Sequence, residues 1–226
     1  MNQDIQKGGT FDIILSVGKA CRSSHYLRGH DLMFCANPLS WMTINSLDSV
    51  IHLYKTEFSD FFVDFVKDEQ RSLEQNCSCF IDIKNNIETM HYEILGINHT
   101  EFRAKMVARF QKINRILLHA NKICFISSRI ESIDVFKKFL EKMAELYSGN
   151  ITCINIRKNT DIDNTSLIKH YKEKISDKLE LIEYEFYDVH PQGDDLKINS
   201  NAWMGNYAIW NHIMKRISLT NNNSSL

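Results

Sequence analysis

The sequence predicts an α/β fold, a single domain with a mainly parallel central sheet flanked by helices. Four short, continuous apolar runs have the character of strands buried on both faces, and they span residues 11–18, 122–128, 151–156 and 179–188. Helical patterns separate these runs along the chain. Strands that alternate with long helices form β–α–β units, in which the strands run parallel.

The chain shows no sign of an internal domain boundary. It contains only two prolines in 226 residues, and no Pro-rich or Ser-rich linker or repeat interrupts it. We therefore expect one domain over residues 1–218, followed by a disordered polar tail over residues 219–226.

Composition and charge narrow the function classes. The hydrophobic share of 43% and the charged share of 24% are those of a soluble globular protein, and the net charge of −1 predicts neither a nucleic-acid nor a membrane partner. The polar stretch Met1–Thr10 is no signal peptide, so we expect a cytoplasmic protein, although signal-independent secretion leaves no mark in a sequence. The six cysteines lack the spacing of a disulfide scaffold and are expected to be free thiols. Composition leaves the oligomeric state open.

The first predicted strand, residues 11–18, ends at Gly18. The segment CRSSHYLRG, which follows two residues later, has the length of two helical turns, and Gly29 is a suitable stop for it. Residues 31–42 lack a periodic pattern, and the Asn37-Pro38 pair predicts a turn there.

The middle of the chain predicts two long helices with a strand between them. From Ser46 to Phe65 the apolar side chains step by three and four residues, which indicates an amphipathic helix with Ser46 at its N-cap. Residues 79–83 predict a short strand, and residues 102–117 predict the second helix.

The last part of the chain has the most regular pattern. Residues 133–146 predict a helix between two apolar runs, and a short helix is expected before the run 179–188. A closing helix over residues 203–217 would place Trp203 and Trp210 on one buried face.

Cys21 is the first candidate for chemistry. It lies just beyond the carboxyl end of the first predicted strand, where sites form in parallel sheets. Gly18 permits a tight turn into the helix, and a thiol in the first helical turn meets unpaired N–H groups that favour the thiolate. Arg22 and His25 are close enough to contribute. The competing interpretation is a small core residue, because free cysteine is among the most buried residue types.

A metal site is the weaker use of the same residues. Cys21, His25, His30 and Cys35 form a C-x3-H-x4-H-x4-C pattern, but Gly29 should end the helix before His30, and the spacing matches no common zinc finger. The chain also lacks a glycine-rich phosphate loop. We expect no metal and no cofactor.

A cysteine nucleophile needs a base from elsewhere in the fold. His91 and His99 lie between a predicted strand and a long helix, in the kind of segment that often carries catalytic groups.

Four blocks together resemble one family, the bacterial papain-like cysteine peptidases, a group named largely by prediction. The blocks are SVGKACRSSHYLRGHDLMFCANPLSWM (16–42), NNIETMHYEI (85–94), RFQKINRILLHANKICFISSR (109–129) and NAWMGNYAIWNHIMKRI (201–217). They are similar to the family's Ser-Leu-Gly-x-x-Cys and Pro-Phe-Asp-Trp, His-Asp, Arg-Phe helix, and Trp-x-Gly-Asp patterns.

The resemblance implies Cys21 as nucleophile and His91 as base, with His99 as the fallback. It also implies a peptide, isopeptide or ester as substrate. The candidate substrate-binding residues that accompany this interpretation are Gly18, Arg22, Asn37, Trp41, His99 and Trp203.

Three acidic positions of the family pattern carry neutral residues here, namely Ser40, Tyr92 and Asn206. A cysteine–histidine pair can operate with an asparagine that orients the imidazole, so Asn206, with Asn37 behind it, is a catalytic candidate. The same replacements fit a member that has kept the fold as an inactive or non-enzymatic binding domain, for a glycan or sugar-nucleotide intermediate.

Two alternatives remain to the interpretation as a cysteine-dependent hydrolase with a parallel α/β sheet. The family name implies a papain-like α+β fold with an antiparallel sheet instead of a parallel one. A cysteine after a strand, followed by an Asn-Pro turn, is also similar to the GSCFA group of SGNH-like esterases, which has a parallel sheet. Our expectation is a cysteine-dependent hydrolase that uses a Cys–His pair.

Overall fold

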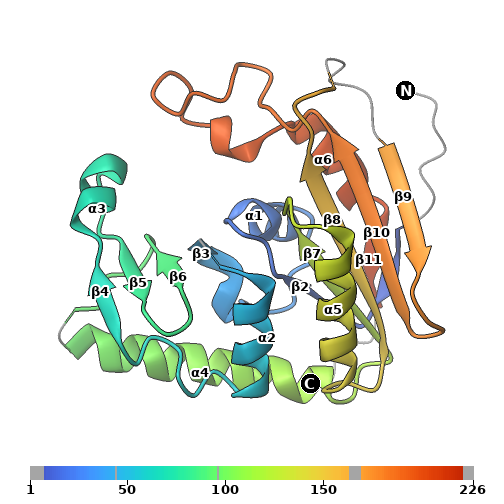
Figure 1. Ribbon diagram of the computed structural model, residues 1–226, viewed down its shortest axis with the longest axis horizontal. Helices are drawn as coiled ribbons and strands as arrows, with labels where there is room; N and C mark the ends of the chain where they lie inside the picture. The colour runs from blue at the N-terminus through green and yellow to red at the C-terminus, as the bar shows by residue number, and fades with distance from the viewer. Residues whose placement is uncertain (1–7, 44, 96, 163–168, 221–226) are drawn as a thin grey trace.

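A computed structural model of the protein describes residues 8–43, 45–95, 97–162 and 169–220 (Figure 1). Its central sheet has the strand order β2-β7-β8-β10-β9, and the first four of these strands are parallel. The strands are β2 (Ile13–Ser16), β7 (Lys122–Ser127), β8 (Asn150–Lys158), β10 (Leu179–Phe186) and the antiparallel edge strand β9 (Lys169–Lys174). The predicted α/β fold with a mainly parallel sheet flanked by helices is confirmed.

Helices cover both faces of this sheet. They are α1 (Arg22–Gly29) and α6 (Tyr207–Met214) on one face, and α2 (Leu47–Lys55), α4 (Ile97–Leu117) and α5 (Ile133–Ala144) on the other. Successive side chains of a strand point to opposite faces. Accordingly, Cys124 of β7 belongs to the core cluster that contains Trp210, and Phe125 packs against Phe139 in the other cluster. This explains why the strands read as continuous apolar runs.

A short parallel pair, β1 (Gly9–Phe11) and β11 (Ile217–Leu219), joins the two ends of the described chain. The backbone N–H of Thr220 donates to the carbonyl of Phe11 over 2.8 Å. Ordered structure therefore continues past the predicted boundary at residue 218, and the rest of the predicted tail, residues 221–226, lies outside the described residues.

A second, antiparallel sheet lies beside the first, with the order β3-β6-β5-β4. Its elements are β3 (Met42–Thr43), β4 (Phe65–Lys67), β5 (Phe80–Asp82) and β6 (Ile87–Thr89), together with α3 (Glu69–Gln75). Figure 1 shows the long helix α4 running along the bottom of the view, beneath this second sheet and beneath α2. Only β5 was predicted, as part of the run 79–83. Strands β3 and β6 lie in segments without an apolar run, and β4 begins at the end of the predicted helix.

The predicted helix from Ser46 to Phe65 is wrong beyond Lys55. Glu57, Phe58 and Phe62 have positive φ angles of 52°, 59° and 51°, which a right-handed helix does not allow. The Phe58 and Phe62 side chains are nevertheless fully buried. Turns, and not a helix, therefore bring these phenylalanine side chains into the core.

Two predictions near the carboxyl end also need correction. In place of a short helix before β10, the described part of that segment is β9, an edge strand rich in lysine that pairs with β10. The closing helix is only α6, because a short 3₁₀ helix, η2 (Ala202–Met204), and Gly205 precede it. Trp203 is therefore 37% exposed while Trp210 is buried, so they do not share one helical face.

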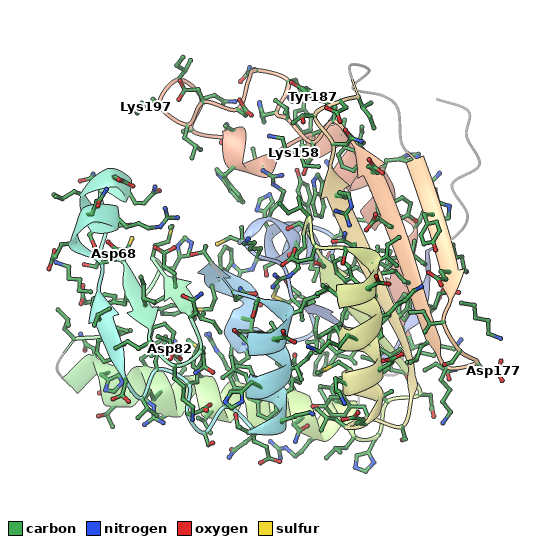
Figure 2. All side chains as sticks on the ribbon, viewed as in Figure 1. Asp68, Asp82, Lys158, Asp177, Tyr187 and Lys197 are labelled. Carbon is green, nitrogen blue, oxygen red and sulfur yellow. The ribbon has the colours of Figure 1, made fainter. Side chains whose placement is uncertain are left out.

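The carboxyl ends of the parallel strands gather at one end of the molecule. Figure 2 shows Lys158, the last residue of β8, at that end, and Asp177, in the turn between β9 and β10, at the opposite end. Among the described residues, no helix has the length and apolar character needed to cross a membrane.

Candidate active site

A cleft of about 590 Å³ opens at the carboxyl edge of the parallel sheet. One wall follows the ends of β2, β7, β8 and β10, and it includes Cys21, Ile130, Ile156 and Asp188. The facing wall belongs to the second sheet and its flanking segments, and it includes Trp41, Thr43, Met90 and His91. The segment between β10 and α6, which extends across the top of Figure 1, adds Leu196 and Trp203.

Cys21 and His91 meet in this cleft. The Cys21 Sγ lies 3.1 Å from Nε2 of His91, although 70 residues separate them along the chain. Cys21 immediately precedes α1, and its carbonyl accepts the first helical hydrogen bond, from the N–H of His25. His91 follows β6, so the second sheet delivers the imidazole to the edge of the first.

The turn that presents Cys21 depends on Gly18. A Cβ at this position would lie 2.3 Å from the Ser23 Oγ, which is itself bonded to the Ser16 Oγ over 2.7 Å. A side chain there would force the Ser23 hydroxyl to move. Gly18 does not line the cleft, so it shapes the turn before Cys21 instead of contacting a molecule bound in the cleft.

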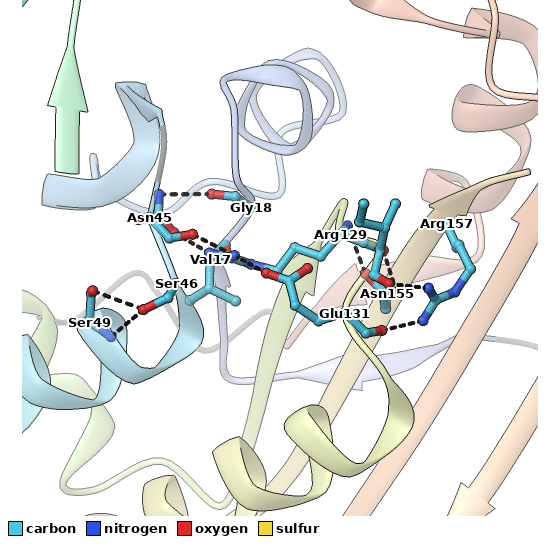
Figure 3. A network of polar contacts seen from close by, with 10 residues as sticks. Val17, Gly18, Asn45, Ser46, Ser49, Arg129, Glu131, Asn155 and Arg157 are labelled. Carbon is cyan, nitrogen blue, oxygen red and sulfur yellow. Dashed lines mark hydrogen bonds and ion pairs between the residues drawn. The ribbon is translucent and has the colours of Figure 1, made fainter. Parts of the chain in front are cut away.

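A buried arginine, which sequence reasoning missed, holds the same loop (Figure 3). Arg129 is 1% exposed, its Nε donates to the carbonyl of Val17 over 2.9 Å, and its Nη1 donates to the carbonyl of Asn45 over 2.8 Å. Glu131 balances the charge with Oε1 at 2.8 Å from Nη1. The only signal in the sequence was an arginine directly after the apolar run 122–128. The network fixes the backbone before Cys21 to the segment that links β3 and α2.

Desolvation sets the protonation of the pair. Burial raises the pKa of Cys21 to about 11, and its own backbone N–H offsets only part of this effect. Desolvation by the surrounding protein lowers the pKa of His91, although the residue as a whole is exposed. Both shifts favour a neutral thiol that donates to a neutral imidazole. The thiolate expected from the position of Cys21 at a helix start is therefore not the favoured resting form.

The imidazole is held by an aromatic ring and not by an acid. The Trp41 ring meets the His91 ring edge-on, with centroids 5.5 Å apart. Among the residues that the structure describes, no side chain hydrogen-bonds to Nδ1 of His91.

Asn206 and Asn37, the candidates for orienting the imidazole, hydrogen-bond elsewhere. The Asn206 Oδ1 caps α6 by accepting from the N–H of Ile209 over 3.4 Å. Asn37 donates to the carbonyl of Ser16 over 2.8 Å and caps the 3₁₀ helix η1 (Pro38–Trp41), which carries Trp41. Both amides support elements that position the cleft.

Asp188 organises the corner beside Cys21, and sequence reasoning missed it too. This carboxylate is 2% exposed, and it binds Arg22 through Oδ2 at 2.5 Å. Its Oδ1 accepts from the N–H of Asn206 over 2.8 Å and from the indole of Trp210 over 3.0 Å. The signal was an aspartate at the end of a buried run, at the edge where sites form.

Two of the other predicted residues also belong to this corner. The Arg22 Nε donates to the carbonyl of Trp203 over 2.6 Å, and the Trp203 ring lies edge-on to His25 at 4.9 Å. Trp203 thereby faces the cleft from α1's side, whereas Trp41 faces it from the side of His91.

His99 does not reach the cleft. It lies in the first turn of α4, with Nε2 at 2.6 Å from the carbonyl of Phe62 and its ring against Phe65. The fallback assignment of His99 as base or substrate contact is wrong for that reason.

The C-x3-H-x4-H-x4-C pattern does not converge either. The His30 Nε2 bonds to Asn211 over 2.8 Å, and Cys35 packs against the core on the far face of the sheet. Within the described ranges, no three metal-ligating side chains form a cluster.

Comparison with known proteins gives one match. A family model covers residues 12–159, which is more than half of the chain and includes both Cys21 and His91. No curated protein and no solved structure matches the chain significantly. The chain therefore belongs to the family described as Putative papain-like cysteine peptidase (DUF1796).

Proposed function

We propose that the protein is a hydrolase in which Cys21 attacks the carbonyl carbon of an acyl bond and His91 carries the proton. One observation supports this above all others: the Cys21 Sγ lies 3.1 Å from Nε2 of His91, inside a cleft at the carboxyl edge of a parallel sheet. That distance suits direct proton transfer between a nucleophile and its base.

In the first half of the reaction, the imidazole accepts the thiol proton while sulfur bonds to the carbonyl carbon. The carbonyl electron pair moves to oxygen, where the backbone N–H groups at the start of α1 stabilise the negative charge. The carbonyl then re-forms, the bond to the leaving nitrogen or oxygen breaks, and His91 protonates the leaving group. A thioester on Cys21 remains.

In the second half, water gives a proton to His91 and attacks the thioester carbon. The carbon–sulfur bond breaks, a carboxylic acid is released, and the proton returns to sulfur. The neutral resting pair makes His91 a general base in the attack step, so the nucleophile is generated only as the bond forms. Peptide, isopeptide and ester bonds all satisfy this chemistry.

Hydrolysis of p-nitrophenyl acetate tests the proposal. Cys21→Ser is expected to lower kcat/KM on the order of 1000-fold, because serine is a far weaker nucleophile beside this base. Cys35→Ser is the matched control, since Cys35 is also a half-buried free thiol but packs against the core instead of a histidine. Equal activity in both variants would contradict the proposal.

A binding domain without catalysis is the second candidate, and one observation favours it. The thiol is held protonated, and the described residues include no acid that could orient His91. Such a domain would use the cleft with its two tryptophans to hold a glycan or sugar-nucleotide intermediate. It predicts no turnover of any ester, together with saturable quenching of tryptophan fluorescence by the glycan ligand.

A further inference from the structure

The position of His91 divides the cleft into two sides. Because the imidazole must protonate the leaving group, the leaving group lies on the His91 side of the sulfur. Trp41 packs against His91 and marks that side. The acyl part of the substrate therefore extends the other way, towards the wall built from the ends of β7 and β8 and from the segment between β10 and α6.

That second side is lined by large apolar side chains. Ile156 is 1% exposed and forms a fixed floor, while Ile130, Leu196 and Trp203 are 68%, 54% and 37% exposed. Exposed apolar surface that lines a cleft gains free energy when an apolar group covers it.

The charged groups on this side are already paired. Arg22 binds Asp188 at 2.5 Å, and Arg129 binds Glu131 at 2.8 Å. Lys158 binds Asp194 at 3.2 Å. A charged acyl group would have to displace one of these partners, whereas an apolar group would leave each pair intact.

The aromatic wall is also held in place before substrate arrives. The Trp203 backbone accepts the hydrogen bond from Arg22, and Tyr26 donates to the carbonyl of Met204 over 2.9 Å. These bonds fix the backbone that carries the Trp203 ring, and the ring itself lies edge-on to His25 with centroids 4.9 Å apart. A wall held in this way costs little ordering free energy on binding.

We propose that this wall is the acyl pocket and that it selects acyl groups with a bulky apolar chain. The inference rests on the proposed function, since it uses the direction in which His91 delivers its proton. A fatty acyl chain and an apolar amino-acid residue share this chemistry, and two series of substrates separate the two sources.

The test compares kcat/KM for two series of p-nitrophenyl esters. One series lengthens from acetyl to octanoyl, and the other carries N-acetylglycyl, N-acetylleucyl or N-acetylphenylalanyl groups. We expect kcat/KM to rise by about two- to fourfold per added methylene until the pocket is filled, given about 0.8 kcal/mol per buried CH₂. A steeper rise in the straight-chain series identifies a fatty acyl source, and a steeper rise from glycyl to leucyl or phenylalanyl identifies a peptide source.

Trp203→Ala is expected to flatten the rise of kcat/KM with chain length in both series. Ile198→Ala is the matched control, because Ile198 lies in the same segment and is 84% exposed but does not line the cleft. A rise that persists unchanged in Trp203→Ala would overturn the pocket assignment.

Failure of the inference and failure of the proposed function give different results. If Cys21→Ser abolishes turnover but chain length has no effect, the pocket assignment falls and the hydrolase stands. If turnover is absent or survives in Cys21→Ser, the hydrolase falls. The pocket is then judged by quenching of tryptophan fluorescence in Cys21→Ser with acetate through octanoate, where binding that tightens with length supports the apolar wall and no trend overturns it.

Discussion

Desolvation determines whether Cys21 or His91 carries the proton that lies between them. Desolvation raises the pKa of the thiol to about 11 and lowers the pKa of the imidazole, so the thiol keeps its proton at neutral pH. The two groups lie within hydrogen-bond distance, and transfer needs no movement of the chain. In the proposed reaction, the sulfur is therefore activated as it attacks.

This protonation predicts a pH profile for alkylation of Cys21 by iodoacetamide, followed for each cysteine by mass spectrometry. The thiolate is the reactive form, and its share rises about tenfold per pH unit below the pKa. With a pKa of about 11, the labelling rate should keep rising between pH 8 and pH 10. A rate that levels off below pH 7 would instead indicate a preformed thiolate–imidazolium pair.

The buried carboxylate of Asp188 is a second single residue on which the cleft depends. Asp188→Asn leaves the guanidinium of Arg22 without its charged partner, and breaking such a pair by removing one member costs about 3 kcal/mol. We expect urea unfolding to show a loss of about that size. Asp194→Asn is the control, because its pair with Lys158 is exposed and should contribute less than about 1 kcal/mol. Equal losses in the two variants would contradict the role given to Asp188.

At the scale of elements, the turn from β2 into α1 and the segment after β6 bring Cys21 and His91 together. The turn is tight because Gly18 has no side chain, and Arg129 ties its carbonyls to the β3–α2 link. The second sheet supplies His91, and η1 supplies the ring that packs on it. Each element contributes one part of the site.

Gly18→Ala tests the turn. The added Cβ would meet the Ser23 Oγ at 2.3 Å, so we expect a loss of about 1–3 kcal/mol in the free energy of unfolding. Adding Ser23→Ala removes the atom that clashes and should recover part of the loss. Gly29→Ala is the matched control, since a Cβ added at Gly29 would have no other atom within 4 Å, and it should be neutral or slightly stabilising. A Gly18→Ala protein as stable as wild type would rule out the steric account.

Long helices and strands with a clear hydrophobic pattern could be predicted from the sequence, whereas most of the short strands could not. The strands β7, β8 and β10 were predicted because both of their faces are buried, which leaves long apolar runs. Strands β3, β4 and β6 have two or three residues each and lie outside any apolar run, whereas β5, which is equally short, lies in the run CFIDI (79–83). The phenylalanines after Lys55 mimic a helix because turns bring them to the core at similar spacing.

At the scale of the whole molecule, the cleft exists because two sheets face each other across the carboxyl edge of the larger one. The placement of Cys21 at this edge followed from its position directly after a predicted strand of a parallel sheet. The approach of His91 could not be derived from periodicity, because it depends on a second sheet that periodicity does not reveal. Its position between a strand and a long helix made His91 a candidate beside His99, and only the resemblance favoured His91 over His99. Asp188 and Arg129 were missed because a charged residue at the end of an apolar run does not reveal whether it is buried or which partner it has.

The central claim is that Cys21 carries the acyl group during turnover, and rapid acid quench followed by peptide mapping tests it most directly. Protein mixed with p-nitrophenyl acetate and quenched at early times should carry an acetyl group on Cys21 that decays as the ester is consumed. His91→Ala should form this adduct more slowly, and Cys35→Ser should form it at the wild-type rate. Turnover without an adduct on Cys21, or with the acetyl group on another residue, would contradict the account.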